Sequence, residues 1–174
     1  MANITRKGIP VTTIGELPAV GGAAPDFELV GKDLVPFTLA DFAGRRVVLN
    51  IFPSLDTGVC AASVRRFNKL AADLENTAVI CASEDLPFAH SRFCVAEGIE
   101  NVVTGSAFRS TFGRDYGVTM ADGEARGLFA RAIVVVDTDG TVIYTELVPE
   151  TGNEPDYDGA MAALGEPSAV SSDA

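Results

Sequence analysis

Cys60 lies at a place in the sequence where a thiol could act as a nucleophile. The segment NIFPSLDTGVC contains the end of an apolar run that stops at Pro53, and a helical pattern begins around Cys60. A cysteine in the first turn of a helix is close to free backbone N–H groups and to the positive end of the helix dipole, and both favour an anion. Because the thiolate rather than the thiol attacks electrophiles, this position predicts a reactive cysteine.

Thr57 and Pro53 fit the same interpretation. Thr57 precedes Cys60 by three residues, so we expect its hydroxyl to face the sulfur across one turn, where it can donate to the thiolate or hold an oxygen beside it. Pro53 ends the strand, has no N–H and can wall off one side of the site. Asp56 is a candidate helix cap. The simpler alternative is that Cys60 is a small buried apolar residue and Thr57 only a cap.

The elements around this segment alternate between strands and helices. Residues 45–52 form a continuous apolar run typical of a central strand, and the apolar spacing of residues 59–74 predicts an amphipathic helix that ends near Asn76. In the next helix, Ser83 or Asp85 can serve as the cap, Pro87 suits the first turn and Gly98 ends it. The remaining predicted elements are strands at 77–83 and 101–106, a short helix near 107–116, a hairpin at 131–148 and a helix at 154–165.

This order predicts an α/β protein with a mixed central sheet flanked by helices. It is compatible with a thioredoxin-like fold that carries an N-terminal extension over about residues 1–25. We expect a single domain over residues 1–165 and a disordered polar tail over residues 166–174.

Composition disfavours several classes of partner. The net charge is −11 and the basic residues occur in pairs such as Arg45 and Arg46, so we expect neither nucleic-acid binding nor attraction to an anionic membrane. No apolar run has the length of a membrane span, and the first residues contain no signal-peptide core. We therefore expect a cytoplasmic protein whose three cysteines are reduced.

The motif around Cys60 resembles that of a known family. PSLDTGVC, residues 53–60, fits the P-x-x-x-T-x-x-C pattern of the peroxiredoxins. Together with DLPFAHSRFC and ARAIVVVD, it makes the chain similar, from about Gly8 to the last helix, to the thiol peroxidase group of atypical 2-Cys peroxiredoxins. The resemblance implies a thioredoxin fold, a homodimer, no metal or organic cofactor, and reduction of hydrogen peroxide and organic hydroperoxides in antioxidant defence.

The resemblance also implies a role for each site residue. Cys60 would be the peroxidatic cysteine that becomes a sulfenic acid, and Cys94 the resolving cysteine that forms a disulfide with it in the same chain; thioredoxin would then reduce this bond. Thr57 and Arg131 would hold the thiolate and the peroxide oxygens, and Pro53 would shield the sulfenate from over-oxidation. A guanidinium suits this task because it stays charged where negative charge develops. The alternative for Arg131 is a salt bridge at the end of a strand.

The implied disulfide raises a geometric question. A disulfide requires Cα atoms within about 7 Å, whereas the axes of packed helices lie about 8–10 Å apart. We therefore predict that the reduced protein holds the sulfurs of Cys60 and Cys94 too far apart to bond, and that both segments unwind locally. Cys81 lies in the middle of a predicted strand, where an inert core role is expected.

The sequence also contains patterns similar to metal sites and to other redox proteins. His90 and Cys94 are four residues apart, as in some zinc sites, but the chain has no C-x-x-C pair and no second histidine. His90 is therefore expected to be a solvated helix residue. DTDGTV, residues 137–142, is similar to a calcium loop but better predicts a hairpin turn. A disulfide oxidoreductase of the thioredoxin type and a redox sensor both stay open, since catalytic turnover would be needed to separate them.

Overall fold

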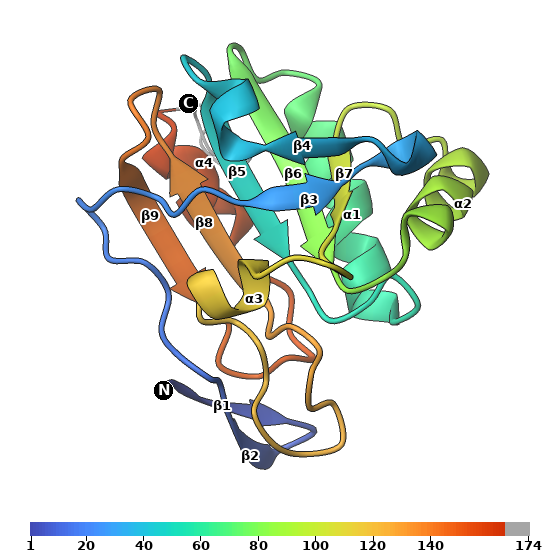
Figure 1. Cartoon of the computed structure of the whole chain (residues 1–174), viewed down its shortest axis with the longest axis vertical. Coiled ribbons are helices and arrows are strands. Elements are labelled where there is room, and N and C mark those ends of the chain that lie inside the picture. Colours follow the sequence, from blue (N-terminus) through green and yellow to red (C-terminus); the bar gives the residue numbers. More distant parts are fainter. Residues whose placement is uncertain (166–174) are drawn as a thin grey trace.

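The computed structural model describes residues 1–165, so the predicted disordered tail lies outside the described residues. A seven-stranded sheet runs through the molecule in the order β4-β3-β7-β6-β5-β8-β9 (Figure 1). Its strands are β3 (Glu28–Val30), β4 (Pro36–Thr38), β5 (Arg46–Ile51), β6 (Thr77–Ser83), β7 (Val103–Ser106), β8 (Ala132–Val136) and β9 (Val142–Leu147).

The centre of the sheet is mixed, as the sequence predicts. β5 pairs in parallel with β6 and antiparallel with β8, so Leu49 lies between Ile80 and Val134. The residues of β6 and β8 are all buried, which explains why these segments read as continuous apolar runs rather than alternating ones. The predicted hairpin is β8 and β9, which pair antiparallel.

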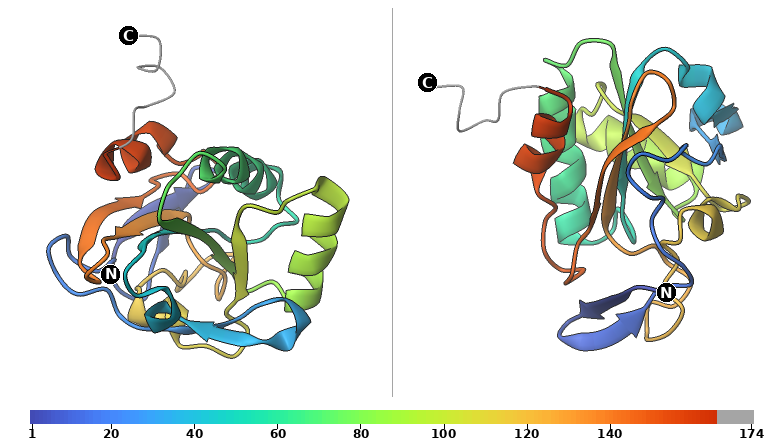
Figure 2. Two further views of the ribbon diagram at one scale, coloured as in Figure 1. Left: turned by 90° about the horizontal axis from the view of Figure 1, so that it is seen from above. Right: turned by 90° about the vertical axis from the view of Figure 1, so that its left-hand side faces the viewer.

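The helices divide between the two faces of the sheet. α1 (Gly58–Ala71) and α4 (Tyr157–Ala163) lie side by side on one face, and α3 (Phe112–Asp115) lies on the other (Figure 2). Neighbouring residues of β5 face different cores: Val48 packs with Phe67 of α1, and Leu49 with Phe112 of α3. α2 (Pro87–Glu97) packs against β7 and a 3-10 turn, η1 (Lys32–Leu34); a second turn, η2 (Leu39–Phe42), follows β4.

Two details of the predicted helices are wrong. α1 ends at Ala71 rather than near Asn76, because the chain leaves it through two tight turns while Leu70 and Leu74 still pack on the core. The second helix begins at Pro87 and ends before Gly98, whose φ of 65° is left-handed, as predicted. However, neither Ser83 nor Asp85 caps it: the residue before the helix is Leu86, and no side chain caps the first turn.

The N-terminal extension is a hairpin of β1 (Asn3–Arg6) and β2 (Ile9–Thr12). It is tied to the main body by Glu150, whose carboxylate accepts hydrogen bonds from Gly8 N at 2.8 Å and Thr5 Oγ1 at 3.1 Å. The hairpin therefore has a fixed position beside the loop that follows β9. Within residues 1–165, no helix has the length and apolar character needed to cross a membrane.

Candidate active site

Cys60 occupies the place that the sequence predicts, as the third residue of α1. β5 ends at Ile51, the buried Pro53 follows, and the helix starts at Gly58. Thr57 is the residue before the helix, and no side-chain hydrogen bond caps the first turn; Asp56 is exposed and is not the cap. Cys60, which is fully buried, therefore lies in the first turn of a helix that no side chain caps.

Arg131 is the residue that gives this thiol a charged partner. It immediately precedes β8, and its side chain is buried, with 2% of the residue exposed. Its Nη2 donates to Cys60 Sγ at 3.2 Å, and its Nε donates to the carbonyl oxygen of Thr151 at 3.0 Å. Nη1 is buried and has no hydrogen-bond partner among the described residues. The guanidinium is thus held in place with Nη2 on the sulfur and Nε on a carbonyl, while Nη1 has no partner among the described residues.

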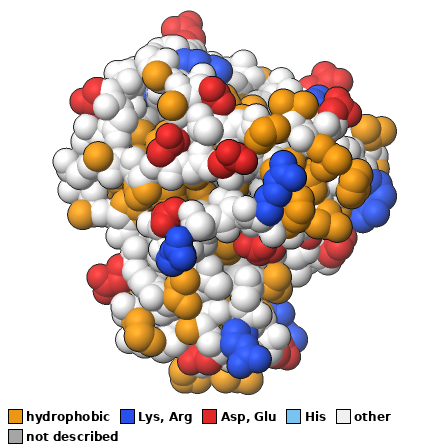
Figure 3. All heavy atoms as spheres, in the orientation of Figure 1, with side chains coloured by type: hydrophobic (Ala, Val, Ile, Leu, Met, Phe, Trp, Pro, Cys, Tyr) orange, Lys and Arg blue, Asp and Glu red, His pale blue; other side chains and the backbone are white. Residues whose placement is uncertain are grey.

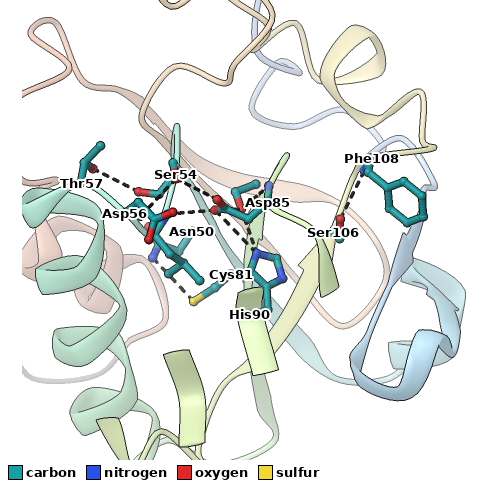
Figure 4. A network of polar contacts seen from close by, with 11 residues as sticks. Asn50, Ser54, Asp56, Thr57, Cys81, Asp85, His90, Ser106 and Phe108 are labelled. Carbon is teal, nitrogen blue, oxygen red and sulfur yellow. Dashed lines mark hydrogen bonds and ion pairs between the residues drawn. The ribbon is translucent and has the colours of Figure 1, made fainter. Parts of the chain in front are cut away.

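Thr57 lies close to this pair but does not bond to the sulfur in the way the sequence predicts. Its hydroxyl donates to the carbonyl oxygen of Ser54 at 3.1 Å (Figure 4). The residue also lines a cavity of about 340 Å³ together with Thr151, the residue whose carbonyl holds Arg131; the other lining residues are Arg6, Lys7, Glu150, Gly152 and Asn153. The prediction that Thr57 faces an oxygen beside the sulfur stays a prediction.

Cys94 and Cys81 share one apolar cluster with Cys60. All three thiols are free, Cys94 is partly exposed, and it lines a groove of about 880 Å³ between η1 and α2. Burial raises the pKa of the Cys94 thiol, and the positive charge of Lys32 partly offsets this shift. Cys94 is therefore placed near the outer boundary of the cluster that encloses Cys60.

Cys81 is the most isolated thiol of the three. It lies in the middle of β6 with no exposed surface, and its Sγ accepts a long hydrogen bond of 3.7 Å from Asn50 Nδ2. Burial raises the pKa of Cys81 to about 12, despite the opposing effect of the Asn50 amide. At neutral pH this thiol is protonated, which agrees with the predicted inert role.

His90 is not the solvated helix residue that the sequence predicts. It is 1% exposed, because α2 turns this side toward the end of β6 and leaves Phe88 in solvent instead. Its Nε2 lies 2.8 Å from Ser83 Oγ. Among residues 1–165, no three histidine, cysteine, aspartate or glutamate side chains come together in a way that could hold a metal.

Ser54 and Asp85 are site residues that our interpretation of the sequence missed. The Ser54 hydroxyl donates to Asp85 Oδ1 at 2.8 Å, which joins the loop before α1 to the loop before α2 (Figure 4). A signal for this pair does exist in the sequence. β5 and β6 are parallel neighbours, so the polar residues that follow them meet at the same edge of the sheet.

The fold and the site define a thioredoxin-like redox protein that uses a buried thiol at a helix start. Comparison with known proteins agrees with this class: residues 19–161 match the Redoxin family. A peroxiredoxin-like protein from Aquifex aeolicus has a solved structure with a TM-score of 0.90 and 38% identity, covering 95% of this chain and 96% of that one. A thiol peroxidase from Chromobacterium violaceum shares the fold, with a TM-score of 0.86 at 22% identity over 94% of this chain and 95% of that one.

Curated relatives narrow the class further. The thiol peroxidase of Mycobacterium tuberculosis is 59% identical over 165 residues, which cover 95% of this chain and 99% of that protein. The thiol peroxidase of Corynebacterium glutamicum is 57% identical over 164 residues, or 94% and 99% of the two chains. The chain belongs to the thiol peroxidase group of the Redoxin family.

Proposed function

We propose that this protein is a thiol-dependent peroxidase that reduces hydrogen peroxide and organic hydroperoxides, with Cys60 as the peroxidatic cysteine and residues 1–165 as one catalytic domain. The observation that carries the assignment is the Arg131 guanidinium, which is buried 3.2 Å from the sulfur of Cys60 at the start of α1. The sulfur thus accepts a hydrogen bond from a buried cation at the start of a helix, a place suited to a cysteine that acts as a nucleophile. Membership of the thiol peroxidase group supports the same activity.

The first chemical step uses both Cys60 and Arg131. The thiolate attacks the terminal oxygen of the hydroperoxide, an S–O bond forms and the O–O bond breaks. The sulfur is oxidised to a sulfenic acid, and the other oxygen takes a proton from solvent and leaves as water or an alcohol. The free Nη1 of Arg131 is the donor available for the negative charge that develops on the leaving oxygen. We assign Thr57 to the peroxide oxygen as well, because it lines the cavity next to Thr151.

The second step joins Cys60 to Cys94. The thiol of Cys94 attacks the sulfenic sulfur, an S–S bond forms and water leaves. Both residues are in helices and Cys60 is fully buried, so we propose that the first turn of α1 and part of α2 unwind to bring the sulfurs together. Pro53, which is buried next to this turn, would limit access of a second peroxide to the sulfenate.

The third step returns the protein to its dithiol form through a thiol reductant. We propose thioredoxin in the cytoplasm as this reductant and a homodimer as the working form, following the thiol peroxidase group. The groove beside Cys94 and the exposed side chains of Val35, Phe88 and Val95 support a protein partner on this side. Figure 3 shows hydrophobic side chains gathered where η1 and α2 lie.

Steady-state assays with and without thioredoxin test the proposal against its two rivals. A peroxidase consumes hydroperoxide for many turnovers when thioredoxin is supplied, and it stops when thioredoxin is left out. A disulfide oxidoreductase would instead reduce a disulfide substrate without any peroxide. A redox sensor would be oxidised once and turn over slowly, and this result would refute the peroxidase assignment.

A further inference from the structure

Asp85 lies at the centre of a polar network that connects the two cysteine-bearing segments (Figure 4). Its carboxylate accepts three hydrogen bonds: from Ser54 Oγ at 2.8 Å, from the backbone N–H of Leu55 at 2.8 Å and from Ser83 Oγ at 2.6 Å. The side chain is only 10% exposed. Three donors on a mostly buried carboxylate make a strong arrangement, since hydrogen bonds to a charged acceptor contribute more than neutral ones.

One arm of the network reaches α2 through Ser83. The Ser83 hydroxyl donates its hydrogen to Asp85, so the oxygen must accept from His90, and His90 therefore carries its proton on Nε2. His90 is one helical turn before Cys94 on α2. Its other ring nitrogen, Nδ1, is buried without a hydrogen-bond partner among the described residues.

The other arm reaches α1 through Ser54. The carbonyl oxygen of Ser54 accepts hydrogen bonds from the Thr57 amide at 3.2 Å and from the Thr57 hydroxyl at 3.1 Å. Thr57 is the residue directly before α1, three positions from Cys60. A continuous path of hydrogen bonds and short loop segments thus runs from His90 on α2 to the turn that holds Cys60.

We propose that this network is a latch: Asp85 is a positioning residue that keeps the loop before Cys60 and the helix carrying Cys94 docked together, and its release frees both for disulfide formation. The inference rests on the proposed reaction, in which the Cys60 sulfenic acid and the Cys94 thiol give a disulfide and one water. Because the loop bonds to the Asp85 carboxylate directly and α2 reaches it through the Ser83 hydroxyl, loss of either arm weakens the hold on the other. The latch therefore couples two local openings that would otherwise be independent.

The histidine makes release of the latch depend on pH. Burial lowers the pKa of His90 to about 4, and the Asp85 carboxylate opposes this shift only in part. When α2 is released, the ring regains an ordinary pKa of about 6.5. Above that pH the ring is neutral in both states. Between about pH 6.5 and 4 only the released ring binds a proton, so falling pH favours release.

Other charged groups surround this part of α2. Glu84 adjoins the network, and burial raises its pKa to about 7, so its exposure would favour release as pH rises, the opposite direction. Lys32 on η1 acts on Cys94, and the Arg65–Glu97 ion pair joins α1 to the end of α2. The pH response of His90 is therefore measured as the difference between the natural protein and His90→Gln, which keeps a donor for Ser83 but does not titrate.

Hydrogen exchange of the reduced, peroxide-free protein tests the latch directly. Asp85→Asn replaces one carboxylate oxygen with an NH2 group, which faces hydrogen-bond donors and cannot accept from them. We therefore expect backbone hydrogen exchange to rise roughly 10- to 100-fold in residues 54–60 and in α2 together. The strands β5 and β8 should keep their protection. Ser91→Ala, next to His90 on the same helix, is the matched control and should leave both segments unchanged. An equal rise across β5 and β8 would make Asp85 a general stability residue and would refute the latch.

The pH arm compares the natural protein with His90→Gln at pH 7.5 and 5.5. The ratio of their opening constants in α2 should rise about tenfold between these values, as expected from a pKa of about 4 when docked and about 6.5 when released. A ratio that does not change with pH would remove His90 from the latch. Rapid-quench mass spectrometry, which detects loss of one water after sulfenate formation, should show faster disulfide formation in Asp85→Asn. An unchanged rate there, with normal peroxide attack, would refute the latch and leave the proposed function intact.

Discussion

Cys60 and Cys81 differ in their neighbours rather than in their burial. Both are 0% exposed, and both belong to the apolar cluster between α1, α2 and β6. Cys60 is at a helix start and accepts a hydrogen bond from the Arg131 guanidinium. Cys81 is in the middle of a strand, next to the neutral amide of Asn50. Two buried thiols of one apolar cluster thus have different electrostatic surroundings.

The comparison shows that burial alone does not decide whether a cysteine can react. Both thiols are removed from water to the same extent. Cys60 accepts a hydrogen bond from a buried guanidinium, whereas Cys81 faces a neutral amide and burial raises its pKa to about 12. The different surroundings of the two thiols follow from the fold. Cys60 lies on α1, just beyond the end of β5, whereas Cys81 lies within β6 and is paired with strands on both sides.

The largest expected effect on the peroxidase rate comes from replacing Cys60 and Cys81 in turn. Cys60→Ser should lower the rate constant for hydroperoxide reduction by at least about 10⁴-fold, since a serine hydroxyl cannot replace the thiolate nucleophile. Cys81→Ala should keep the natural rate and cost only about 1 kcal/mol of stability. Stopped-flow peroxide consumption and denaturant unfolding measure the two quantities. Equal losses of rate in both variants would contradict the claim that Cys60 is the reactive cysteine and Cys81 an inert one.

Alkylation gives the next largest contrast without any substitution. Because burial raises the pKa of Cys81 to about 12, its thiolate fraction at pH 8 is roughly 10³-fold below that of an ordinary thiol. Iodoacetamide should therefore modify Cys81 at least that much more slowly in the folded protein than in the unfolded chain. Peptide mass spectrometry follows each site separately. Rapid labelling of Cys81 in the folded state would contradict its inert role.

Arg131→Lys tests whether the guanidinium is the source of the difference. A lysine keeps the charge but cannot hold Thr151, the Cys60 sulfur and a peroxide oxygen at once, so we expect a loss of about 10²-fold in the rate of peroxide attack. The exposed Arg126, which is five residues earlier, supplies the matched control, since Arg126→Lys should leave the rate unchanged. A fully active Arg131→Lys variant would mean that charge alone is sufficient.

The smallest expected effect concerns Thr57. Thr57→Val removes the hydroxyl that bonds to Ser54 and keeps the shape of the side chain, so the rate should fall about tenfold. Thr57→Ser restores the hydroxyl and should recover most of the rate. Single-turnover kinetics at several peroxide concentrations would show whether the loss lies in binding or in the attack itself. A Thr57→Val rate equal to that of the natural protein would restrict Thr57 to a structural role.

Much of the site could be predicted from local sequence, because strand, turn and helix follow one another around Cys60. The fold class, β6, the end of α2 at Gly98 and the hairpin of β8 and β9 are predictable for the same reason. Arg131 is distant in sequence, and only the resemblance to peroxiredoxins pointed to it. The burial of His90 is not predictable in the same way, because the polar residues of a short helix do not indicate which side faces the sheet; Asp85 lies in the loop before α2, and its role depends on the parallel pairing of β5 and β6. The early end of α1 was missed because Leu74 stays apolar for packing after the helix has ended.

The most direct test of the account is to map the cysteines after a single turnover. The reduced protein receives one equivalent of hydroperoxide, and its peptides are then examined by mass spectrometry under non-reducing conditions, beside Cys60→Ser and Cys94→Ser. The account predicts a Cys60–Cys94 disulfide within one chain, a sulfenic acid at Cys60 in Cys94→Ser, and no reaction in Cys60→Ser. A disulfide that includes Cys81, or a Cys60→Ser protein that reacts as fast as the natural one, would contradict it.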